Sequence, residues 1–80
     1  MQFVYALKSR KDGKLYVGCT ANIEERLEYH NSGKVFSTKN RRPFVLVFQE
    51  AYENKYEAFA KEKYYKTAKG KKELKNKIGQ

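Results

Sequence analysis

The chain has 80 residues, of which 18 are lysine or arginine and nine are acidic, giving a formal net charge of +9. A chain of this length has room for one thin core and one site, which excludes a second domain or a large cofactor cavity. The basic balance attracts polyanions, either nucleic acid or an anionic membrane surface. We therefore expect one domain over residues 1–80 with an anionic partner, although a lysine-rich surface without any partner has the same composition.

Cysteine usage and hydropathy narrow the setting. The only cysteine, Cys19, excludes an internal disulfide and is expected to act as a small core hydrophobe. No Cys/His cluster has zinc spacing. The apolar stretch 1–7 is too short for a signal peptide, and no run reaches transmembrane length. We expect a cytoplasmic protein without a membrane partner, and nothing in the sequence points to an obligate protein partner.

The first part of the chain predicts a β-hairpin. Residues 3–7 and 15–20 are rich in aromatic and branched side chains, which favour strands. Asp12-Gly13 between them is a turn signal. A two-residue loop at this dipeptide pairs Lys11 with Lys14, Leu7 with Gly18, and Tyr5 with Thr20.

This register sorts the side chains onto two faces, because paired residues point to the same side of a sheet. One face carries Tyr5, Leu7, Tyr16 and Gly18, and the other carries Val4, Ala6, Val17 and Cys19. Since both sets are largely apolar, we expect both sides of the sheet to be covered.

A helix is predicted to follow the hairpin. Asn22 to Glu25 resembles a capping box, and the helix should run to about Ser32, with Gly33 as its C-terminal cap. Helical spacing places the acids Glu24, Glu25 and Glu28 on one side, and Ile23, Arg26, Leu27 and His30 on the other. A basic side chain and a histidine thus lie beside the core-facing stripe, which a purely structural helix would not favour.

The remaining elements are a strand and two helices. Residues 34–42 form a basic loop, and the apolar run 44–48 predicts a buried, central strand. A helix is expected over 55–66, with a broad apolar face made by Tyr56, Phe59, Ala60 and Tyr64. Gly70 should end that segment before a last basic helix over 71–78. The expected fold is α/β of the α+β type: a three-stranded antiparallel sheet flanked by three helices, in the order β-β-α-β-α-α.

Several motifs together resemble the GIY-YIG nuclease superfamily, in its small standalone members. Tyr5 and Tyr16-Val17-Gly18 are similar to the paired signature that names the family. The resemblance continues through the helix that carries Arg26, the helix that carries Glu62 and the tail around Gly70. It covers nearly the whole chain. The chain departs from several nuclease members at Cys19, where they carry a lysine directly after the second motif, and only Asn76 is near the place of a late asparagine.

The resemblance implies metal-dependent phosphodiester cleavage, and the residue types suit that chemistry. Arg26 can hold two phosphate oxygens, and Glu62 is a hard ligand for Mg²⁺ or Mn²⁺, bound weakly without substrate. Tyr5 and Tyr16 offer phenols as a base, with Tyr5 favoured, and His30 could bind phosphate or relay a proton. Each has a structural alternative: sheet aromatics for the tyrosines, an Arg26–Glu62 ion pair, and a satisfied helix histidine.

We therefore expect an endonuclease acting on DNA, with roles in repair or recombination implied by the resemblance. The predicted nucleic-acid-binding residues are Gly18, Lys34, Lys39, Arg41, Arg42, Lys69, Lys71 and Lys72. The alternative is a non-catalytic nucleic-acid-binding module of the same fold. A second alternative is a basic ribosome- or RNA-associated protein.

Overall fold

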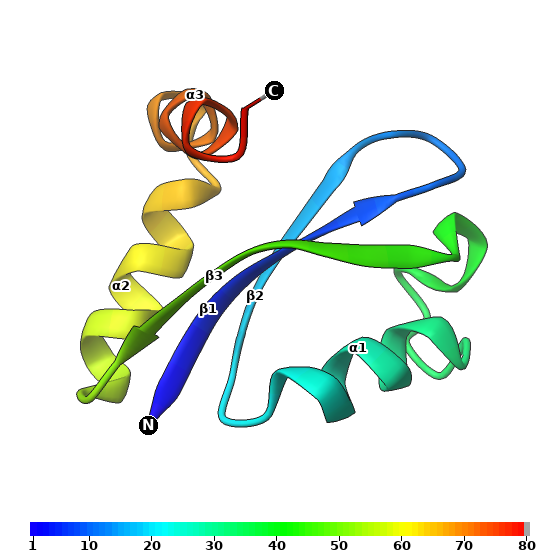
Figure 1. The fold of residues 1–80 in the computed structure, drawn as a ribbon, viewed down its shortest axis with the longest axis horizontal. Helices are drawn as coiled ribbons and strands as arrows, with labels where there is room; N and C mark the ends of the chain where they lie inside the picture. The colour runs from blue at the N-terminus through cyan, green and yellow to red at the C-terminus, as the bar shows by residue number, and fades with distance from the viewer. Residues whose placement is uncertain (80) are drawn as a thin grey trace.

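The structure is a computed structural model that describes residues 1–79. It confirms the expected element order and the α+β class (Figure 1). The elements are β1 (Gln2–Ser9), β2 (Leu15–Thr20), α1 (Ile23–Asn31), a short 3-10 helix η1 (Lys39–Arg41), β3 (Phe44–Tyr52), α2 (Lys55–Tyr65) and α3 (Ala68–Lys77).

The three strands form one antiparallel sheet in the order β2-β1-β3. The central strand is therefore β1, and the expectation that the apolar run 44–48 lies in the middle is wrong. β1 has four consecutive buried residues, Val4 to Leu7, because helices cover both of its faces. β3 is an edge strand in which exposed and covered residues alternate, and Val45 is 36% exposed.

The hairpin register differs by two residues from the predicted one. Tyr5 lies opposite Gly18, and Leu7 lies opposite Tyr16. The turn starts early because the Ser9 hydroxyl accepts hydrogen bonds from the backbone N–H groups of Lys11 and Asp12, at 3.1 and 3.2 Å. A shift of two residues keeps every side chain on its predicted face, since the side-chain period of a strand is two.

Each face of the sheet has its own core. On one face Tyr5, Leu7 and Phe44 pack with Ile23 and Leu27 of α1. On the other, Val4, Ala6 and Val17 pack with Ala58, Tyr65 and Leu74 of α2 and α3. Figure 1 shows α1 on one side of the sheet and α2 with α3 on the other. The expectation that both sides are covered is confirmed.

The helix α2 buries a different face from the predicted one. Ala58 and Tyr65 are fully buried, whereas Tyr56 is 70% exposed and Phe59 is 41% exposed. Positions 58, 62 and 65 recur at helical spacing, so the inward stripe carries Glu62 together with the two buried residues. The small Ala58 lets the helix approach the sheet closely. Of the larger side chains on the predicted face, Tyr56 and Phe59 are exposed and Tyr64 is partly buried against the core.

Gly70 lies inside α3 and does not end the preceding helix, which corrects the predicted break. The N-cap of α3 is Thr67, whose side chain accepts a hydrogen bond from the Gly70 N–H at 3.0 Å. A Cβ atom on Gly70 would lie 2.5 Å from the carbonyl carbon of Tyr64 and closer still to its oxygen. Glycine therefore permits the tight packing of α3 against the end of α2. Within residues 1–79, no helix is long and apolar enough to span a membrane.

Candidate active site

The phenol of Tyr5 lies over Gly18 on the neighbouring strand. Tyr5 is 3% exposed, and a Cβ on Gly18 would lie 2.5 Å from its Cζ atom and closer to its hydroxyl. The tyrosine ring thus fills the space that a side chain at residue 18 would take. Gly18 was predicted to let nucleic acid approach, but in the structure it is buried and admits Tyr5.

His30 connects this phenol to the basic loop. Its Nε2 lies 3.4 Å from the Tyr5 hydroxyl, and its Nδ1 lies 3.0 Å from Oγ1 of the buried Thr38. The Thr38 hydroxyl donates to the Val35 carbonyl, so Oγ1 accepts from Nδ1–H and leaves Nε2 as the acceptor for the Tyr5 O–H. Burial, and then the charge of Arg26, lower the pKa of His30 below its ordinary value. The imidazole is therefore buried and neutral, and it positions the Tyr5 hydroxyl by accepting its hydrogen bond.

Tyr16 is the more accessible of the two phenols. Its ring packs edge-on against His30 with centroids 4.7 Å apart, and it is only partly buried. The two tyrosines lie on the same face of the sheet, as predicted. Tyr16 therefore presents a hydroxyl at the surface, above the buried Tyr5–His30 pair.

Arg26 projects from α1 at the edge of a hollow of about 280 Å³ that Thr20, Asn22, Glu25 and Tyr29 also line. Its guanidinium stacks over the Tyr29 ring at 5.7 Å. Within residues 1–79, Arg26 forms no ion pair with Glu62. The alternative in which these two side chains form a structural ion pair is therefore wrong. The guanidinium is free to bind an anion bidentately.

Glu62 lies on the inward stripe of α2, on the opposite side of the sheet from α1. Its side chain is 23% exposed, and its carboxylate pairs with the Lys66 ammonium at 2.8 Å. Among residues 1–79, no three His, Cys, Asp or Glu side chains gather into a metal site. A single carboxylate that already attracts a cation suits a metal ion whose other ligands are water and substrate oxygens.

The electrostatics of Tyr5 link these side chains. Burial raises the pKa of Tyr5 well above its ordinary value, and the neighbouring Tyr16 raises it further. Arg26 lowers that pKa and Glu62 raises it. Residues from β2, α1 and α2 thus all affect the pKa of this one phenol on β1.

Comparison with known proteins identifies the family of the chain. A model of the GIY-YIG catalytic domain matches residues 1–77. The chain belongs to the GIY-YIG family. This is a nuclease family, so the chain carries a nuclease-type domain.

Similar proteins of other bacteria support this assignment. A UPF0213 protein of Staphylococcus haemolyticus is 46% identical over 74 residues, which span 91% of this chain and 89% of that protein. A UPF0213 protein of Clostridium perfringens is 46% identical over 67 residues, covering 82% and 71%. The solution NMR structure of a UPF0213 protein from Bacillus halodurans is 36% identical, with a TM-score of 0.57, and covers 92% of this chain and 82% of that one.

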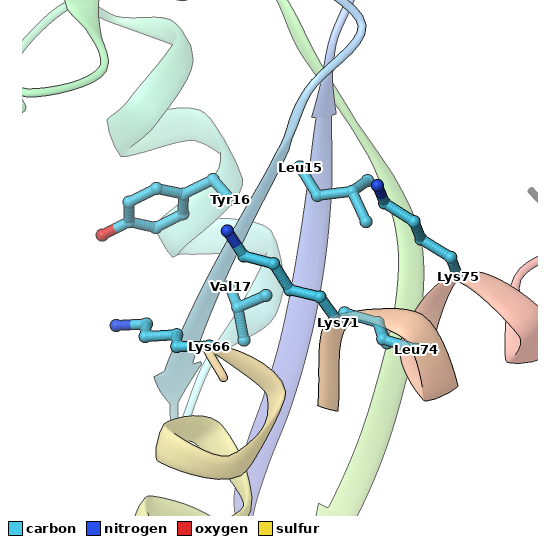
Figure 2. A pocket seen from close by; sticks show the side chains of 7 residues that line it. All are labelled: Leu15, Tyr16, Val17, Lys66, Lys71, Leu74 and Lys75. Atoms are coloured by element: carbon cyan, nitrogen blue, oxygen red, sulfur yellow. The ribbon is translucent and has the colours of Figure 1, made fainter. Parts of the chain in front are cut away.

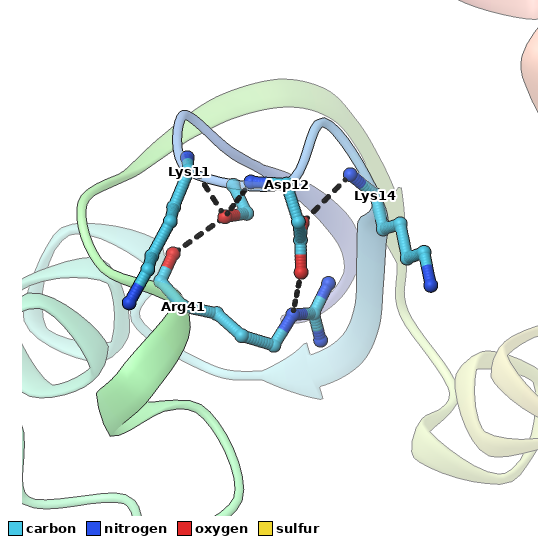
Figure 3. A network of polar contacts seen from close by, with 5 residues as sticks. Lys11, Asp12, Lys14 and Arg41 are labelled. Atoms are coloured by element: carbon cyan, nitrogen blue, oxygen red, sulfur yellow. Dashed lines mark hydrogen bonds and ion pairs between the residues drawn. The ribbon is translucent and has the colours of Figure 1, made fainter.

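The predicted basic loop of the GIY-YIG domain is partly occupied by internal contacts. Arg41 donates from Nε to Asp12 at 2.9 Å, and its carbonyl accepts from the Ser9 hydroxyl at 2.5 Å (Figure 3). The Lys14 N–H, together with Arg41, lowers the pKa of the Asp12 carboxyl. Arg42 donates to the Lys39 carbonyl at 2.7 Å. Of the four loop residues predicted to bind nucleic acid, Lys34, Lys39 and Arg42 are exposed and form no ion pair within residues 1–79.

The two predicted basic segments lie apart. Figure 1 shows η1 and α3 at opposite sides of the GIY-YIG domain, whose longest dimension is 30 Å. Lys69, Lys71 and Lys72 are exposed on α3. The predicted binding set did not single out Lys66 and Lys75, which line a cavity with Tyr16 and Lys71. The spacing of four residues between Lys71 and Lys75 was the available signal, because it places both on one helical face.

Proposed function

We propose that this GIY-YIG domain is an endonuclease that hydrolyses DNA phosphodiester bonds with the help of Mg²⁺ or Mn²⁺. The observation that carries the proposal is the contact of both tyrosines with His30, on the face of the sheet that is covered by α1, the helix that carries Arg26. Hydrolysis needs a base for water and positive charge on the phosphate. These side chains supply both.

In this proposal Arg26 holds the reacting phosphate. A guanidinium stays charged at any working pH and matches two phosphate oxygens. The stacking of Arg26 on Tyr29 limits its freedom before substrate arrives. This pre-organisation favours binding of the more negative transition state over the starting ester.

In the same proposal Tyr16, after losing its own proton to solvent, accepts the proton of the attacking water. Tyr5 was the favoured base on sequence grounds, but its hydroxyl is buried and donates to His30. A phenol whose pKa is raised by burial releases its own proton less readily. We therefore assign Tyr5 and His30 to positioning and Tyr16 to direct contact with water.

Glu62 holds the metal. When bound, a divalent ion supplies a Lewis acid that neutralises charge on the phosphate oxygens. The family lysine replaced by Cys19 has a local substitute in Lys66, whose ammonium lies 2.8 Å from Glu62 and lines the cavity with Tyr16. Lys66 therefore brings positive charge to this region without a lysine at residue 19.

A non-catalytic nucleic-acid-binding module is the second candidate. It is favoured by the Lys66–Glu62 pair, since an ammonium that stays on the carboxylate would exclude the metal. A role in DNA repair or recombination belongs to the first candidate and rests on the family alone.

Cleavage of plasmid, branched and single-stranded DNA with Mg²⁺ or Mn²⁺ tests the proposal. Glu62→Gln keeps size and removes the charge that attracts the metal, so cutting should be lost while DNA binding persists. Glu57→Gln, on the exposed side of the same helix, is the matched control and should cut normally. Arg26→Ala should slow cutting about 10²–10³-fold, as loss of one preorganised donor does.

The outcomes separate the two candidates. If the wild-type protein binds all three substrates but cuts none of them, as expected for Glu62→Gln, the protein is a non-catalytic binding module. Equal cutting by wild type and Glu62→Gln would assign the activity to another site or to a contaminant.

A further inference from the structure

A cavity beside the candidate active site lies between the free edge of the sheet and the C-terminal helices. It measures about 260 Å³, and we refer to it as the lysine cavity. β2 forms one wall, and the end of α2 with α3 forms the other (Figure 2). The residues that line it are Leu15, Tyr16, Val17, Lys66, Lys71, Leu74 and Lys75.

The charges around the lysine cavity are all of one sign. Figure 2 shows Lys66, Lys71 and Lys75 reaching from the helices toward β2. No acidic side chain of residues 1–79 lines it. Lys66 is balanced by Glu62, but Lys71 and Lys75 form no ion pair in the part of the chain that the structure describes. The two unbalanced ammoniums favour an anionic occupant.

The floor of the lysine cavity is apolar. Leu15, Val17 and Leu74 supply it, and Leu74 is fully buried. Three lysines alone would suit any phosphate, whereas an apolar floor of this size also suits one flat ring. The volume of about 260 Å³ lies below the range usual for larger cofactors, about 300–1,000 Å³. One nucleobase with its phosphates at the rim matches both the charge and the floor.

Tyr16 joins this cavity to the candidate active site. It lines the cavity and packs against His30. A strand whose reacting phosphate lies at Tyr16 and Arg26 would therefore place a neighbouring nucleotide beside Lys71 and Lys75.

We propose that the lysine cavity binds one unpaired nucleotide of the strand being cut, next to the reacting phosphate. The position of the cut rests on the proposed function. An unpaired nucleotide is required because bases in a duplex stack on both faces, and neither face is then available to the floor. The substrate class is thus single-stranded or locally opened DNA.

Binding of a fluorescein-labelled oligothymidylate in chelator tests the charged wall. Lys71→Gln/Lys75→Gln should weaken binding at least about tenfold and reduce the slope of log K against log salt by about 1.4, from two lost phosphate contacts on a single strand. Lys55→Gln/Lys63→Gln, two exposed lysines of α2, removes the same charge away from the cavity and should keep the slope. Equal slopes for the two double variants would overturn the proposal.

An abasic strand of equal length tests the floor. Wild type should bind oligothymidylate about fivefold or more tighter than the abasic strand, as expected for one base held against a side-chain surface. Leu15→Ala should remove most of this preference and keep the salt slope. Phe36→Ala is the control, because Phe36 is 84% exposed and offers a rival stacking surface in the loop. Loss of the preference in Phe36→Ala, and not in Leu15→Ala, would refute the assignment.

These measurements need no metal and no turnover. If the protein never cuts DNA but its binding depends on Lys71 and Lys75 of the lysine cavity, this inference stands and the nuclease proposal is wrong. If the protein cuts DNA normally but its binding does not depend on Lys71 and Lys75, the nuclease proposal stands and this inference is wrong.

Discussion

At the scale of single residues, the two phenols have different roles in the proposed mechanism. Tyr16 is accessible, whereas Tyr5 is buried and bound to His30. Tyr16→Phe should therefore reduce the cleavage rate by at least about 10²-fold, the usual contribution of a general base. Tyr5→Phe should cost less activity and should lower Tm, because it removes a buried hydrogen bond. Single-turnover kinetics with both variants check this, and the opposite order would return the base to Tyr5.

His30 predicts how stability depends on pH. Burial lowers its pKa in the folded state below the ordinary value of 6.5. Just below pH 6.5 the unfolded chain takes a proton that the folded chain refuses. Acidification therefore favours unfolding. The contribution of the neutral His30 to the free energy of unfolding is complete only above pH 6.5. His30 is the only histidine. Urea unfolding between about pH 7 and 5 should show a loss of up to about 1.4 kcal/mol per pH unit. His30→Asn should flatten this slope, and an unchanged slope would contradict the assignment.

The residue scale also shows where sequence reasoning held. Tyr5 and Tyr16 share a face despite the register error, because a shift of two residues preserves the strand alternation. Thr38 could not be foreseen as the partner of His30. A threonine in a polar loop carries no periodic signal, and its burial depends on how the loop folds back.

At the scale of elements, the contact between α2 and α3 depends on Gly70. An added methyl group would meet backbone atoms of Tyr64 and Tyr65, which cannot turn aside as a side chain can. Gly70→Ala should destabilise the fold by about 1–3 kcal/mol, the usual cost of overpacking. Thermal unfolding measures this, and Lys69→Ala on the exposed part of the same helix should stay within about 0.5 kcal/mol of wild type. A Tm for Gly70→Ala equal to that of the control would show that the helices can move apart.

Element-level prediction failed where apolar residues were taken as buried. The aromatic side of α2 is exposed, and its inward stripe is Ala58, Glu62 and Tyr65. Likewise the apolar β3 is an edge strand. In both cases the sequence pattern predicts the element, although β3 extends four residues beyond the predicted 44–48. Which neighbours each element packs against is decided by its contacts with β1.

At the scale of the whole molecule, positive charge lies at both ends. The net charge of +9 is divided between the η1 loop and α3, on opposite sides of the fold. Affinity for duplex DNA should therefore fall steeply with salt, by about 0.9 in log K per log unit of salt for each phosphate contacted. Fluorescence anisotropy at several salt concentrations measures the slope. Binding that ignores salt, or no binding at low salt, would argue against any nucleic-acid role.

The candidate site is assembled across the sheet, with Arg26 on α1 and Glu62 on α2, and the exposed Glu53 and Asn54 separate β3 from α2. A chain divided at that connection would leave the arginine proposed to bind phosphate in one fragment and the carboxylate proposed to bind metal in the other. Neither fragment would hold a complete set of reacting groups. The domain is thus suited to fragment complementation, in which cutting reports that two fused partners have brought the halves together.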